Sequence, residues 1–87
     1  MNEGDAFIAI ADANRHHLLE ELRRGEKTVT QLAAGLPVSR PAVSQHLKVL
    51  LDAGLVSARA EGTKRFYAVS ATGFTHLNLW LDQFWEG

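Results

Sequence analysis

The sequence predicts a mainly α-helical fold with a small β-hairpin, in the order α-α-α-α-β-β-α. Helical patterns with capping residues fill most of the chain up to Gly54. Two runs rich in β-branched and aromatic residues follow, "LVSARA" and "RFYAVS", with "EGTK" between them as a turn. A helical pattern then returns at Ala71. At 87 residues, the chain is expected to form a single domain, residues 1–87.

The first half of the chain contains two predicted helices before its central motif. Residues 5–11, "DAFIAIA", form a short apolar helix. Asp12 is a suitable N-cap for the next helix, because its carboxylate can accept hydrogen bonds from the first unpaired N–H groups. That second helix should end near Gly25, a residue type common at helix C-termini.

The centre of the chain predicts a helix-turn-helix at about residues 28–53. Thr28 and Gln31 have the spacing of a capping box, and the helix that they open should end near Gly35. Ser39 is the expected N-cap of the following helix, which spans about residues 39–53 and ends before Gly54. The hairpin at about residues 55–69 then corresponds to a wing, so the predicted fold class is a winged helix-turn-helix.

The helix at residues 39–53 has two different faces. Val43, Leu47 and Leu50 recur at helical spacing and should face the core. The opposite arc carries side chains suited to the donors and acceptors of DNA bases in the major groove. The predicted base-contacting residues are Arg40, Pro41, Ser44 and Gln45.

Other polar side chains in this region are candidates for contact with the DNA backbone. Hydroxyl, amide and cationic groups at the start of a helix or in a wing are typical phosphate ligands. His46 lies between the two faces of its helix, so either a DNA contact or a half-buried structural role fits it. The predicted backbone-contacting residues are Thr28, Thr30, Gln31, Ser39, His46, Lys48, Arg59, Thr63, Lys64 and Arg65.

Charge and composition narrow the class of protein. The net charge is −1, but residues 27–65 sum to +4 and the remainder to −5, a distribution typical of a polyanion-binding centre with acidic flanks. The absence of cysteine excludes disulfides and thiolate metal sites. We find no signal peptide and no apolar run long enough to span a membrane, which predicts a cytoplasmic protein without membrane contact.

The segment "LAAGLPVSRPAVSQHLKVLLDAGLVSARAEGTKRFYAVS" resembles the ArsR/SmtB family of winged-helix bacterial transcription repressors. The resemblance rests on the combination of Ser44-x-His46-Leu47 with "AGLV" at residues 53–56, and extends over nearly the whole chain. Upstream, "ADANRHHLLEEL" resembles the family's "DPTR" segment, with Ala13-Asn14 where Pro-Thr is common. The resemblance implies a dimeric repressor that binds an imperfect palindrome in double-stranded DNA.

The resemblance also implies a homodimer in which the first and last helices pack across a two-fold axis. The predicted last helix, from about Ala71 to Trp85 in a dimerisation segment of about residues 71–86, has an apolar stripe that favours such an interface. The predicted interface residues are Phe7, Ile8, Ile10, Phe74, Leu77, Trp80, Leu81, Phe84 and Trp85.

Other functions fit the sequence less well. Many members of the family bind metal, but His76 has no partner at the expected spacing, and the adjacent His16 and His17 point about 100° apart on a helix. We therefore expect no metal and no cofactor, although an unidentified effector or protein partner stays open. Ser44 and His46 face different directions, so the chain is not expected to be an enzyme. The alternative is a winged-helix protein-interaction module without DNA binding.

Overall fold

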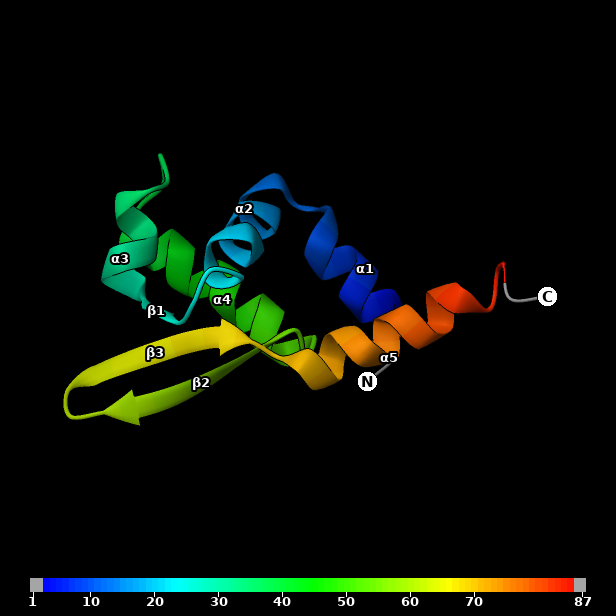
Figure 1. The fold of residues 1–87 in the computed structure, drawn as a ribbon. Coiled ribbons are helices and arrows are strands. Elements are labelled where there is room, and N and C mark those ends of the chain that lie inside the picture. The colour runs from blue at the N-terminus through cyan, green and yellow to red at the C-terminus, as the bar shows by residue number, and fades with distance from the viewer. Residues whose placement is uncertain (1–2, 86–87) are drawn as a thin grey trace.

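The computed structural model describes residues 3–85 and confirms the predicted fold class (Figure 1). The elements in chain order are α1 (Glu3–Ala11), α2 (Ala13–Leu22), β1 (Lys27–Thr28), α3 (Val29–Ala34), α4 (Arg40–Asp52), β2 (Val56–Glu61), β3 (Lys64–Val69) and α5 (Ala71–Asp82). Helices α3 and α4 form the helix-turn-helix, and β2 and β3 form the wing.

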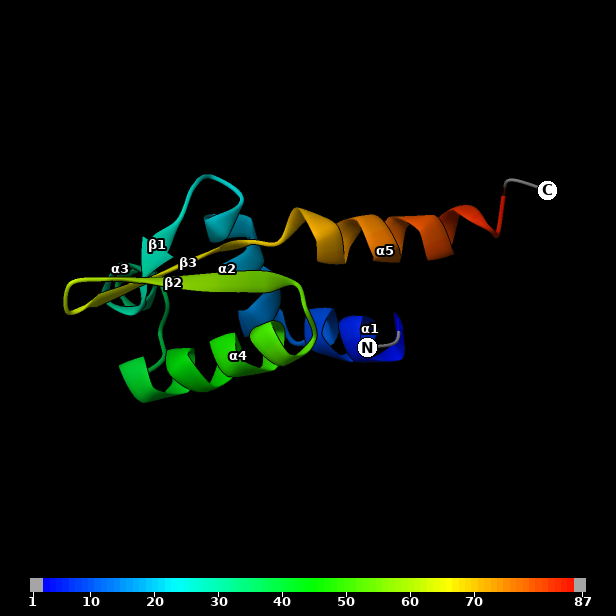
Figure 2. The ribbon, with the colours of Figure 1, turned by 90° about the horizontal axis from the view of Figure 1, so that it is seen from below.

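The molecule is elongated, with extents of 47 × 26 × 22 Å. The loop of the wing lies at one end and the C-terminal end of α5 at the other (Figures 1 and 2). Helix α4 lies on one side of the sheet, while α1 and α5 lie together at the end away from the wing loop (Figure 2). Helix α4, which is predicted to contact DNA bases, is called the reading helix below. It occupies a different region of the molecule from the predicted dimerisation helices α1 and α5.

The wing belongs to a sheet that, within the described residues, has three antiparallel strands in the order β1-β3-β2. The sequence predicted β2 and β3 but not β1, whose two residues are too short to show an alternating pattern. Lys27 pairs with Tyr67 and Thr28 with Phe66, so β1 joins the start of α3 to the wing. Glu61 pairs with Lys64 across a two-residue loop in which Gly62 has φ +62°, a conformation that suits glycine.

Local capping explains where α4 begins and ends, and it confirms the predicted limits. The Ser39 hydroxyl accepts a hydrogen bond from the Ala42 N–H at 3.3 Å. At the other end, Gly54 adopts φ +76° and the Leu55 N–H donates to the Leu50 carbonyl at 3.0 Å. This 6→1 bond, with a second from the Gly54 N–H to Leu51, forms a Schellman motif that turns the chain from α4 into the wing.

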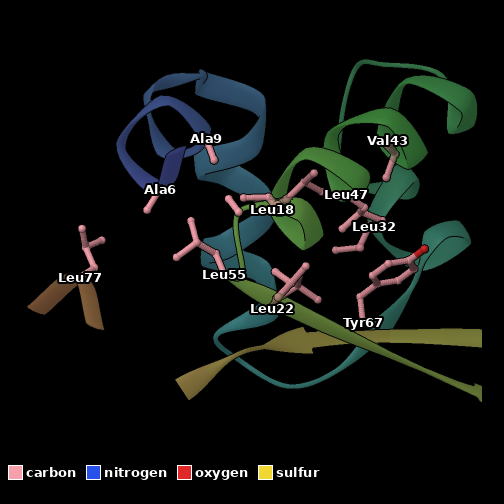
Figure 3. Packing of buried hydrophobic residues seen from close by; sticks show 13 residues of the cluster. Ala6, Ala9, Leu18, Leu22, Leu32, Val43, Leu47, Leu55, Tyr67 and Leu77 are labelled. Atoms are coloured by element: carbon pink, nitrogen blue, oxygen red, sulfur yellow. The ribbon is translucent and has the colours of Figure 1, made fainter. Parts of the chain in front are cut away.

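The core lies between the helix-turn-helix, α2 and the sheet (Figure 3). Leu47, Leu50 and Val43 on α4 are fully buried, as their spacing predicted. Burial of this stripe leaves the opposite side of α4 turned to solvent. The other buried residues are Ala6, Ala9, Leu18, Leu22, Leu32, Ala53, Leu55, Val56, Tyr67 and Leu77.

Helix α5 differs from the prediction in length and in the role of one residue. It ends at Asp82, and residues 83–85 continue as turns with i→i+3 hydrogen bonds, such as that from the Trp85 N–H to the Asp82 carbonyl. Leu77, predicted at the dimer interface, is 7% exposed and belongs to the core of the chain itself. Its place in the apolar stripe reflects packing of α5 against the body of the molecule (Figure 3).

The start of α5 lies against the end of α4. A Cβ atom built on Gly73 would come within 1.9 Å of the Gly54 carbonyl oxygen, far closer than any van der Waals contact allows. Glycine at position 73 therefore permits α5 to pack directly on the turn that follows the reading helix.

Candidate nucleic-acid interface

The solvent-facing side of α4, called its reading face below, carries the side chains predicted to contact bases. Pro41, Ser44 and Gln45 are exposed, and they lie on the side of the helix opposite the buried stripe. Lys48 is exposed on the same side and forms an ion pair with Asp52 at 3.2 Å. The first two turns of α4 therefore present a polar surface suited to a nucleic-acid groove.

Arg40 lies at the start of α4 and reaches toward α3. Its Nη2 donates a hydrogen bond to the Thr30 Oγ1 at 2.7 Å. The same side chain lines a groove of about 460 Å³ between α3, α4 and the wing. The described residues that line this groove are Thr28, Val29, Thr30, Gln31, Arg40, Thr63, Lys64, Arg65 and Phe66.

This groove brings together most of the residues predicted to contact the DNA backbone. Three of its described lining residues, Arg40, Lys64 and Arg65, are cationic, and no carboxylate lies among them. Thr28 and Gln31 also form the capping box of α3: the Thr28 N–H donates to Gln31 Oε1 at 2.9 Å, and Thr28 Oγ1 accepts from the Gln31 N–H. A positive groove lined with hydroxyls is chemically suited to phosphate oxygens.

Arg59 occupies a different electrostatic environment from the other cations of the wing. Its Nε donates to Glu26 Oε2 at 3.0 Å, and its Nη1 donates to Glu61 Oε2 at 2.6 Å. The hydrogen bond from Arg59 lowers the pKa of Glu26 below its ordinary value, and the two carboxylates raise that of Arg59. The guanidinium also lies 4.7 Å from the Phe66 ring. Two carboxylates thus pair with this cation. The pairing with Glu26 could not be predicted from the spacing of residues in the sequence.

His46 is half-buried and contacts a residue that the sequence analysis did not select. The Arg15 Nη1 lies 3.3 Å from the His46 Nδ1. Arg15 is in α2, 31 positions away, so helical spacing within α4 could not have revealed the contact. The histidine therefore has a structural partner, whether or not it also reaches DNA.

The terminal helices expose a group of large apolar side chains. The Phe7 and Trp80 rings pack edge to face at 5.1 Å, and Trp80 packs in the same way on Phe84 at 4.7 Å. Ile8, Phe84 and Trp85 are 65–68% exposed. Leu79, which is not among the predicted interface residues, is 58% exposed. Ile10, Phe74 and Leu81 are partly buried against the core.

Two further observations concern metals and membranes. Among residues 3–85, no three His, Asp or Glu side chains lie close enough together to hold a metal ion. No helix in the described part of the chain has both the length and the apolar character needed to cross a bilayer.

The helix-turn-helix, the exposed polar face of α4 and the cationic groove beside the wing define a winged helix-turn-helix DNA-binding regulator. Residues 12–58 match the family described as "Bacterial regulatory protein, arsR family". The chain belongs to this family, whose members regulate transcription and are not enzymes.

Individual relatives agree with the family assignment. The chain is 51% identical to the HTH-type transcriptional regulator Rv2034 of Mycobacterium tuberculosis strain H37Rv over 92% of its length and 75% of that protein's. It is 29% identical to the transcriptional repressor SdpR of Bacillus subtilis strain 168, covering 92% of this chain and 89% of the repressor. An ArsR-like transcriptional regulator from Rhodococcus sp. RHA1 superimposes with a TM-score of 0.86 at 30% identity, over 94% of this chain and 77% of that structure.

Proposed function

We propose that the chain is a homodimeric repressor that binds an imperfect palindrome in double-stranded DNA in the cytoplasm. The observation that supports this most directly is the continuity of the exposed face of α4 with the cationic groove between α3 and the wing. A helix in the major groove and a wing on the neighbouring backbone would use both surfaces at once.

Within this interface, Pro41, Ser44 and Gln45 are assigned to base edges. Ser and Gln side chains can donate to and accept from bases, and the Pro41 ring offers an apolar contact for a thymine methyl group. Arg40 is hydrogen-bonded to Thr30 and lines the groove with Lys64. We therefore expect its guanidinium to contact a phosphate rather than a base. We propose Arg40 as a backbone-contacting residue, although the sequence predicted it to contact a base.

The remaining phosphate contacts come from α3, α4 and the wing. They are assigned to side chains at the groove or next to the reading face, whose hydroxyl, amide or cationic groups can meet a phosphate oxygen. Arg59 and Lys48 are left out, because Glu26 and Glu61 pair with Arg59 and Asp52 pairs with Lys48. His46 is also left out, because its Nδ1 faces Arg15. The assigned residues are Thr28, Thr30, Gln31, Ser39, Thr63, Lys64 and Arg65.

The dimer is proposed from the apolar surface of the terminal helices. Phe7 and Ile8 on α1 are exposed, as are Phe84 and Trp85 just after α5, and an isologous interface would bury such side chains against a second copy. Such a dimer presents two copies of α4, and in dimers of this kind the two half-sites lie one helical turn, about 34 Å, apart.

The test is selection of sequences from random duplex DNA by the purified protein, with the mass in solution measured by light scattering. A dimer that enriches an inverted repeat supports the proposal. A monomer, or a protein that enriches no motif, would refute it and would favour the protein-interaction module instead.

A further inference from the structure

We propose that Arg15 is a positioning residue that ties the reading helix α4 to the C-terminal end of α1. Through this link, Arg15 would set the angle at which the two copies of α4 meet a palindrome. The inference rests on the proposed dimeric function, because it assigns α1 to the dimer interface and α4 to the DNA.

The side chain of Arg15 uses three N–H donors in two directions. Its Nε donates to the Ala9 carbonyl at 2.8 Å, and its Nη2 donates to the Ile8 carbonyl at 3.3 Å. Both carbonyls belong to the last turn of α1, where backbone oxygens lack partners inside the helix. A cation at this end also complements the helix dipole. The guanidinium is therefore fixed to α1 although Arg15 itself lies in α2.

The third donor reaches the reading helix. Nη1 of Arg15 lies 3.3 Å from Nδ1 of His46. A guanidinium has no acceptor, so this contact requires His46 to be neutral, with its proton on Nε2 and the lone pair of Nδ1 toward Arg15. His46 is flanked on α4 by the exposed Gln45 and the fully buried Leu47. The contact therefore holds α4 at the border between its reading face and its core face.

Asp12 holds Arg15 in place. Its Oδ1 accepts the backbone N–H groups of Asn14 at 2.9 Å and Arg15 at 3.1 Å. These bonds, the Arg15 N–H first, lower the pKa of Asp12, and the charge of the Arg15 guanidinium acts in the same direction. The N-cap of α2 thus fixes the point from which Arg15 reaches both α1 and α4.

The link is separate from the packing that folds α4. Val43, Leu47 and Leu50 anchor α4 in the core, where all three are fully buried, whereas His46 is only half-buried. Loss of the Arg15–His46 contact should therefore leave the fold intact and let the orientation of α4 relative to α1 vary. In a dimer joined through α1, that variation affects the spacing of two half-sites but not the affinity for one half-site.

The experiment compares three single variants. His46→Leu removes the acceptor at similar size, His46→Gln keeps an acceptor oxygen, and Arg15→Met removes the donors while keeping an unbranched stem. Fluorescence anisotropy measures the affinity of each for the selected palindrome, for one half-site, and for palindromes with the spacer lengthened or shortened by one base pair. Thermal melts by circular dichroism monitor folding.

We expect H46L and R15M to lose about tenfold in affinity for the palindrome, within the usual range of coupling between sites. Their half-site affinity should stay at the wild-type value, and their preference for the native spacer should weaken. H46Q should restore both the affinity and the spacer preference. The double variant R15M/H46L should lose no more than either single variant, because both changes break one contact.

Three results would overturn the inference. Equal losses on the palindrome and the half-site would show that His46 acts directly on DNA. Palindrome binding by H46L that matches wild type would show that the link has no effect, and this result does not depend on whether R15M folds. A wild-type protein without a preference for the palindrome over the half-site would instead refute the dimeric function, and this inference with it.

Discussion

Lys64→Ala should make DNA binding markedly less sensitive to salt. The size of this effect can be estimated from the number of cations that line the groove between α3, α4 and the wing. Arg40, Lys64 and Arg65 line it in each protomer, so a dimer would place three cations against phosphates at each of two half-sites. Each phosphate contact contributes about −0.9 to the slope of log K against log salt, which gives about −5.4 for the wild type. Removing Lys64 from both protomers should reduce this slope to about −3.6.

These slopes correspond to easily measured differences in affinity. Between about 50 and 200 mM salt, wild-type affinity should fall about 2,000-fold and that of the Lys64→Ala variant about 150-fold. Fluorescence anisotropy titrations at four or five salt concentrations would measure both slopes. The loss should be the same on cognate and scrambled duplexes, because Lys64 is assigned to the backbone.

Arg59→Ala is the matched control for this experiment. It removes a cation from the same wing, but one already neutralised by Glu26 and Glu61, so the slope should not change. If Arg59→Ala reduces the slope as much as Lys64→Ala does, the distinction between Arg59 and the cations of the groove is wrong. An unchanged slope for Lys64→Ala would remove the groove from the DNA interface.

Substitutions at three further positions test the fold around this interface. Gly73→Ala should lower the midpoint of urea unfolding, because its Cβ would meet the Gly54 oxygen at 1.9 Å. Ala normally stabilises a helix by about 1 kcal/mol over Gly, so a raised midpoint would contradict the close packing. Ser39→Ala should cost about 1 kcal/mol of unfolding free energy through loss of the α4 N-cap, and Ser39→Asp, which keeps an acceptor, should cost less. Because the pKa of Glu26 is lowered in the folded state, its pair with Arg59 stabilises the protein above pH 4.5 and loses this effect as the pH falls through the lower folded value. Glu26→Gln should remove that part of the acid dependence of stability, and an unchanged pH profile would show that the pair contributes nothing.

The predictable parts of this structure are those set by neighbours in the chain. The capping box of Thr28 and Gln31, the N-cap Ser39 and the turn at Gly54 all depend on residues a few positions apart, and all appear as expected. The buried stripe of α4 follows from helical spacing in the same way. The reading face of α4 is the side opposite this buried stripe, so most of the candidate site could be predicted as well.

The features that the sequence did not reveal depend on contacts between distant residues. Glu26 and Arg59 are 33 positions apart, and their pairing changes the assignment of Arg59. Arg15 and His46 are 31 positions apart. Leu77 lies on the apolar stripe of α5, and whether this residue faces the core of its own chain or a second copy follows from how α5 docks on the body of the molecule. Periodicity could not decide these cases, because it describes one element at a time.

The division of α4 into two faces has a consequence for redesign. Pro41, Ser44 and Gln45 can be exchanged as a group without touching the core, because all three point to solvent. His46 and Leu47, directly after them, should be retained, since one contacts Arg15 and the other is fully buried. A library randomised at those three positions alone should therefore yield folded variants with new operator preferences.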